Sequence, residues 1–101
     1  MKIRLLKGAE SNMRTAAAWY EKRQAGLGEG FLQELTRRLK DVELQPRQFG
    51  REECHRTGRD VRFCRLRRFP YRIVFEIREP WIVILAVAHA RRRPGYWKRR
   101  R

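Results

Sequence analysis

The chain has 101 residues, enough for one domain with a single modest core, and its 42% of hydrophobic residues exceeds what is usual for a disordered chain. There are 26 Lys and Arg residues against 11 Asp and Glu residues, a formal net charge of +15. Self-repulsion of this size predicts a polyanionic partner, which can be a nucleic acid, an acidic protein or an anionic membrane surface. A general compositional bias toward arginine is the competing explanation of the charge.

The first part of the chain predicts a strand followed by two helices. Residues 2–7 alternate apolar and basic side chains, so a short half-buried strand is expected to end at Gly8. A helix is expected to begin near residues 9–11 and to run to about Gln24. Its apolar residues at helical spacing are Met13, Ala16, Ala17 and Tyr20, with Trp19 beside them.

Gly26 and Gly28 predict a turn that folds a second helix back onto the first. The second helix carries one apolar stripe, formed by Phe31, Leu35, Leu39 and Val42. Pro46 ends it, and residues 45–59 predict a polar loop with a short turn at most.

Three strand-like runs follow from Val61 onward. Short connections at residues 67–70 and 78–80 separate them, and connections this short join antiparallel strands. The second run alternates, with Tyr71, Ile73, Phe75 and Ile77 predicted to form its one buried face. The third run, residues 81–88, is apolar throughout, which predicts a central strand covered on both faces.

The predicted order is therefore β-α-α-β-β-β, a helical hairpin packed on a small, mostly antiparallel sheet of the α+β class. We expect one domain over residues 1–101, with a basic tail over residues 89–101. The residues expected to form the core, where truncation would unfold the protein, are Trp19, Phe31, Leu35, Phe75 and Ile84.

Several kinds of chemistry have no motif in this sequence. Cys54 and Cys64 are not spaced as CxxC, and with His55 and His89 they do not make a convincing zinc set, so no metal is expected. No cofactor is expected either, because the chain has no phosphate-binding glycine loop. The N-terminus lacks the apolar run of a signal peptide, and no run is long enough to span a membrane. We expect a soluble, cytoplasmic protein without a membrane partner.

Arginines gather around the strands and in the tail, interleaved with aromatic residues. Such a pattern supplies both phosphate pairing and stacking surface, although a charge run is often only a solvated edge. The residues predicted to bind a target or an acidic partner are Arg65, Arg67, Arg68, Arg72, Arg91, Arg92, Tyr96 and Trp97.

His89 follows the third strand and is close in sequence to basic and phenolic side chains. Imidazole, guanidinium and phenol groups can together cleave RNA, by taking the 2′-hydroxyl proton, stabilising the phosphorane and protonating the leaving oxygen. The candidate set is His89, Arg91, Arg92 and Tyr96, and it is catalytic only if the protein is a ribonuclease. A histidine at a strand end can equally cap or pack.

The sequence resembles the RelE/ParE superfamily of toxins from type II toxin–antitoxin modules, and within it the ParE-like, plasmid-stabilisation branch. The resemblance covers nearly the whole chain in order. Its residues are Ala17–Glu21, Gly26–Gly28, the FLxEL run of residues 31–35, Pro46, Phe49, the RRFPY run of residues 67–71, and the AHxRRxPGYW ending of residues 88–97.

The resemblance implies a helical hairpin on a curved antiparallel sheet and a cognate antitoxin whose acidic or amphipathic segment masks the basic surface in a hetero-oligomer. It leaves the target open. ParE-type members poison DNA gyrase, which we favour here, whereas RelE-type members cleave mRNA on the ribosome without a metal. A basic nucleic-acid-binding protein without toxicity is the third alternative.

Overall fold

The structure is a computed structural model that describes residues 1–51 and 58–91. Its elements in chain order are β1 (Lys2–Leu5), α1 (Lys7–Arg23), α2 (Leu27–Leu44), the single 3-10 turn η1 (Pro46–Gln48), β2 (Val61–Arg65), β3 (Tyr71–Arg78) and β4 (Trp81–His89). The predicted order of one strand, two helices and three strands is confirmed, as is the α+β class.

The strands form one mixed sheet in the order β1-β4-β3-β2. The β2–β3 and β3–β4 pairs are antiparallel, whereas β1 runs parallel to β4, which the long stretch of chain between these two strands permits. Residues 82–88 of β4 are all buried, and the strand lies between β1 and β3. The prediction that the apolar third run is central is therefore confirmed.

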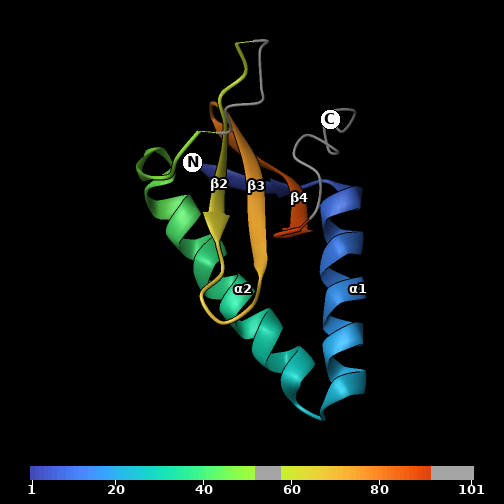
Figure 1. Ribbon diagram of the computed structural model, residues 1–101. Helices are drawn as coiled ribbons and strands as arrows, with labels where there is room; N and C mark the ends of the chain where they lie inside the picture. The colour runs from blue at the N-terminus through green and yellow to red at the C-terminus, as the bar shows by residue number, and fades with distance from the viewer. Residues whose placement is uncertain (52–57, 92–101) are drawn as a thin grey trace.

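Both helices pack on the same face of the sheet. In Figure 1 they meet at their connection and open away from it, and the strands lie across the open side. The main core contains Phe31, Leu35, Phe75 and Ile84, each fully buried. These four core predictions are confirmed. Trp19 is the exception, because its side chain remains 50% exposed.

The opposite face of the sheet carries a second, smaller apolar cluster, which contradicts the prediction of one buried face on β3. It consists of Val61, Val74, Val83, Leu85 and Ala86, with Leu6 packed against it. Val74 and Glu76 alternate with the predicted buried face of β3, yet they are only 0% and 4% exposed. Strand alternation gives the face on which a side chain lies, but it does not show whether that face is covered.

The helical hairpin differs from the prediction at both helix starts. α1 begins at Lys7, so Gly8 lies inside the helix rather than at the end of the strand. α2 begins at Leu27, and Gly28 is helical. Only Gly26 serves the turn, with a positive φ of 87° that favours glycine.

Gly28 allows the two helices to approach closely. A Cβ atom at this position would lie 2.5 Å from the carbonyl oxygen of Ala17 in α1. Glu21 of α1 also joins the two helices, because its carboxylate accepts hydrogen bonds from the backbone N–H groups of Gly26 at 2.9 Å and Gly28 at 3.0 Å. A side chain of α1 thus satisfies amide groups that the first turn of α2 leaves unpaired.

We expect Gly28→Ala to lower the free energy of unfolding by about 1–3 kcal/mol, because the methyl group meets a backbone atom that cannot move independently. The matched control is Gly30→Ala in the same helix, where the new Cβ would meet only the tip of Arg68 at 3.4 Å. That variant gains helix propensity and is expected to be as stable as the parent or up to about 1 kcal/mol more stable. Urea unfolding followed by circular dichroism measures both, and equal stability of the two variants would contradict the close packing.

Candidate binding surface at the β2–β3 turn

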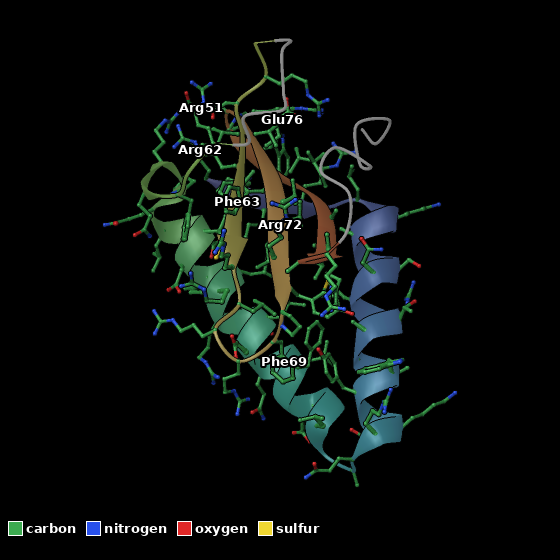
Figure 2. The ribbon with its side chains drawn as sticks, viewed as in Figure 1. Arg51, Arg62, Phe63, Phe69, Arg72 and Glu76 are labelled. Carbon is green, nitrogen blue, oxygen red and sulfur yellow. The ribbon has the colours of Figure 1, made fainter. Side chains whose placement is uncertain are left out.

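The β2–β3 turn, residues 66–70, is the centre of the basic surface. Arg65 at the end of β2 is the cross-strand partner of Arg72 near the start of β3. Both guanidinium groups lie over the ring of Phe63, at 5.7 Å for Arg65 and 5.4 Å for Arg72 from the ring centroid. Figure 2 shows Phe63 and Arg72 close together on neighbouring strands. Like charges directly opposite each other repel, and the aromatic face offsets part of that repulsion.

A hollow of about 530 Å³ opens beside this pair. We call it the sheet-end hollow. It is lined by Arg65, Leu66, Arg67, Arg68, Phe69, Pro70, Tyr71, Arg72 and Ala90. Four of the predicted binding residues, Arg65, Arg67, Arg68 and Arg72, are therefore brought together in one concave surface.

Glu34 of α2 holds the turn in place. Its buried carboxylate accepts the backbone N–H groups of Arg67 and Arg68, the latter at 3.0 Å, and the side-chain Nε–H of Arg68 at 3.2 Å. Burial would raise the pKa of Glu34, but the hydrogen bonds from Arg68 and Arg67 and the Arg68 charge outweigh it and lower the pKa. The carboxylate is thus held in its charged form where the turn requires an acceptor.

A second hollow, of about 440 Å³, lies on the other side of the same turn. We call it the α2 hollow, and its lining residues are Glu34, Arg37, Arg38, Lys40, Asp41, Arg67 and Arg68. Arg38 joins it to the sheet, because its Nε–H donates to the carbonyl oxygen of Arg65 at 3.0 Å and its Nη1 pairs with Asp41 at 2.8 Å. Arg67 and Arg68 line both hollows.

The sequence prediction missed the α2 side of this surface. Arg37, Arg38 and Lys40 are not among the residues that were predicted to bind a target or an acidic partner. A signal was present, since residues 34, 37, 38 and 41 share one face of a helix and combine two carboxylates with two arginines. The position of the β2–β3 turn over that face of α2 could not be predicted from the sequence.

A third hollow, of about 360 Å³, is mostly aromatic and lies between α1 and the start of β3. Its lining residues are Thr15, Ala16, Trp19, Tyr20, Pro70, Tyr71 and His89, and we call it the aromatic hollow. Arg23 covers part of the exposed Trp19 ring, with its guanidinium carbon 4.3 Å from the ring centroid. Half-exposed aromatic surface of this kind is typical of a contact site for a partner.

Of the residues proposed for RNA cleavage, the structure describes His89 and Arg91, while Arg92 and Tyr96 lie outside the described residues, as does Trp97, which was predicted only to bind a target or partner. The His89 ring packs edge-on against Tyr71 with centroids 5.2 Å apart. Its Nδ1 accepts the backbone N–H of Arg91 at 3.1 Å. This geometry matches the packing and capping role that was the alternative for a histidine at a strand end.

The far end of the sheet is a contrasting region, where a carboxylate neutralises the arginines. Glu76 accepts both Nε and Nη2 of Arg59, at 2.9 and 2.7 Å, and pairs with Arg78 at 2.7 Å. Burial opposes ionisation of Glu76, but hydrogen bonds from Arg59 and Arg78 prevail, so its pKa is lowered. Figure 2 places Glu76 toward the end of β3 away from Phe69.

Within the described residues, no group of three or more His, Cys, Asp and Glu side chains could hold a metal ion. Burial raises the pKa of the Cys64 thiol to about 11, which makes this sulfur a poor nucleophile. In the same part of the chain, neither helix combines the length and apolar character needed to cross a membrane. The arginines that line the two hollows at the β2–β3 turn are suited to binding anions.

The fold and this surface define the class of protein: a small α+β domain with a helical hairpin on a four-stranded sheet and a cationic, partly aromatic surface at one end of that sheet. The chain matches the family described as ParE toxin of type II toxin-antitoxin system, parDE, over residues 3–94. It therefore belongs to the ParE toxin family.

A solved structure of similar fold is the chromosomal ParDE TA system from P. aeruginosa. The similarity covers 88% of this chain and 95% of that chain, with a TM-score of 0.71 and 20% sequence identity. No curated protein sequence matches this chain. The superfamily resemblance seen in the sequence is confirmed, and so is the fold it implied.

We expect Glu34→Gln to lower the free energy of unfolding by roughly 2–3 kcal/mol at neutral pH, because a neutral amide cannot accept the N–H groups of the turn as strongly as the carboxylate. Since the pKa of Glu34 is lowered by folding, its contribution is present above the ordinary glutamate value and is lost as the pH falls through the folded value.

The stability difference between parent and Glu34→Gln should therefore shrink on acidification, as measured by urea unfolding across a pH series. Glu29→Gln, in the first turn of the same helix and exposed, is the matched control and should change stability by less than about 0.5 kcal/mol. A pH-independent difference for Glu34→Gln would contradict the role of its charge.

Proposed function

We propose that this protein is a toxin that arrests bacterial growth by poisoning DNA gyrase, and that a cognate antitoxin neutralises it. The observation that carries the proposal is the match to the ParE toxin family over residues 3–94, nearly the whole chain. Gyrase poisoning is the activity typical of ParE-type toxins. The target lies in the cytoplasm, and so, on this proposal, does the toxin.

The geometry of His89 favours gyrase poisoning over RNA cleavage. A general base needs a free nitrogen directed at the proton that it removes. In His89, Nδ1 already accepts the Arg91 amide and the ring packs against Tyr71. The ribonuclease remains the alternative, because Arg65 and Arg72 near the same sheet end could stabilise a phosphorane.

The proposed antitoxin has an acidic or amphipathic segment and forms a hetero-oligomer with the toxin. The charge of +15 supports an acidic partner, and the aromatic hollow offers apolar surface to the other side of such a segment. The two kinds of surface are adjacent, since Pro70 and Tyr71 line both the aromatic and the sheet-end hollows. Carboxylates would pair with the predicted arginines, and only buried or bidentate pairs would contribute strongly.

Inducing the toxin alone in a bacterial host should stop growth, and inducing it together with the adjacent small gene should restore growth. Colony counts after induction measure both effects. The control is a frameshifted toxin gene in the same vector. Normal growth of cells that contain folded toxin without the neighbour would contradict the toxin assignment.

Purified toxin mixed with gyrase and supercoiled plasmid should trap double-strand breaks that appear as linear DNA after detergent and protease treatment. The parallel arm contains translating ribosomes and labelled mRNA, which should remain intact. Antitoxin added first should abolish the linear product. Cleaved mRNA together with undamaged plasmid would overturn the gyrase proposal in favour of the ribonuclease.

A further inference from the structure

Three arginines around the β2–β3 turn are exposed and have no carboxylate partner within the described part of the chain. They are Arg37 on α2, Arg65 on β2 and Arg67 in the turn. Arg37 lines the α2 hollow, Arg65 lines the sheet-end hollow, and Arg67 lines both. The unneutralised charge therefore runs continuously from the sheet face across the turn to the helix.

The carboxylates in the same region are already occupied. Glu34 is buried and accepts the turn amides and Arg68, and Asp41 pairs with Arg38 at 2.8 Å. The turn is therefore held by one internal carboxylate, whereas the guanidinium groups that it presents are directed outward. Arg65 at the end of β2 presents its guanidinium group to the sheet-end hollow, where a phosphate could accept its hydrogen bonds.

We propose that the sheet-end hollow and the α2 hollow form one continuous site for the phosphodiester backbone of a nucleic acid, bound by the toxin itself. This binding activity does not depend on the gyrase assignment. Its centre is Arg67, which lies between the two hollows, and the Arg65–Phe63–Arg72 group forms its sheet end.

Two features favour a phosphate backbone over an acidic protein segment as the occupant. Phosphates follow one another at every nucleotide, which suits cations spread over two adjoining hollows, whereas the carboxylates of an amphipathic segment recur only about once per helical turn. The site also places guanidinium groups beside aromatic rings, at Phe63 and at Phe69, where Arg68 lies 5.4 Å from the ring centroid. Guanidinium and aromatic groups in alternation are typical of surfaces that bind nucleic acids.

The test measures binding of the full-length toxin, without gyrase, to fluorescent duplex DNA, single-stranded DNA and single-stranded RNA of equal length at several salt concentrations. The test variant is Arg37→Ala, Arg65→Ala and Arg67→Ala combined. The control variant removes the same charge from α1, by Lys7→Ala, Arg14→Ala and Lys22→Ala combined. Circular dichroism first checks that both variants are folded.

The proposal expects the parent to bind at least one of the three probes, and the tightest of them identifies the nucleic acid. The slope of log affinity against log salt should fall by about 3 in the test variant, one for each lost phosphate contact, and by less than about 1 in the control. Equal slopes in the two variants would show a general charge effect and overturn the site. So would an absence of binding to all three probes.

A further arm adds polyglutamate carrying as many charges as the nucleic acid. Displacement of the probe by polyglutamate as effective as that by an equal charge of unlabelled nucleic acid would show that the surface does not prefer phosphates to carboxylates, and would overturn the proposal. Failure here is distinguishable from failure of the proposed function. If the toxin binds nucleic acid but traps no gyrase breaks, the nucleic-acid site is supported and gyrase poisoning is contradicted. If it traps breaks without binding nucleic acid, gyrase poisoning is supported and the nucleic-acid site is contradicted.

Discussion

The contact on which the candidate binding surface depends is the one between the Glu34 carboxylate and the backbone amides of Arg67 and Arg68. A surface turn has no sheet partner for its N–H groups and would otherwise sample several conformations. Here a charged acceptor on α2, itself almost fully buried, fixes the turn through main-chain atoms. The arginine side chains are then free to point outward, so a single internal carboxylate orients several external cations.

The chain has a net charge of +15, and its arginines have different partners at the two ends of the sheet. At the far end, the buried Glu76 is clamped by Arg59 and Arg78, so positive charge is cancelled inside the protein. At the β2–β3 turn, Arg65 and Arg72 both lie over the face of Phe63. Aromatic faces offset repulsion only in part, so the energetic cost of the uncancelled charge is concentrated where an anionic partner can relieve it.

Most of the fold could be predicted from the sequence, because each element carries a strong local signal. The apolar run of β4 and the stripe of α2 through Phe31 and Leu35 are patterns with one natural interpretation. The starts of the helices could not be predicted as well. In the sequence, Gly8 and Gly28 suggest the boundaries of helices. Gly28 is instead required inside α2, because the carbonyl oxygen of Ala17 in α1 leaves no room for a Cβ atom there.

The candidate site was predicted only in part, for a related reason. Arg65, Arg67, Arg68 and Arg72 are close in sequence, and a hairpin brings them together. Arg37 and Arg38 are some thirty positions away, and tertiary contacts bring them to the turn: the hydrogen bonds of Glu34, the bond from Arg38 to the carbonyl oxygen of Arg65, and the packing of Phe69 against Phe31. Trp19 was wrongly predicted to be core because of its large apolar side chain, although it lies beside the helical stripe of Met13, Ala16, Ala17 and Tyr20 that packs against the sheet.

The adjacency of the three hollows suggests how one partner could control the binding of another. Pro70 and Tyr71 belong to both the aromatic and the sheet-end hollows, and Arg67 and Arg68 belong to both the sheet-end and the α2 hollows. A segment anchored by apolar residues against Trp19 and Tyr71 would carry its acidic groups directly onto the turn. It would then occupy the guanidinium groups that a phosphate backbone needs. On the proposed function, competition for the same arginines would let an antitoxin block the binding of a nucleic acid without a change of shape in the toxin.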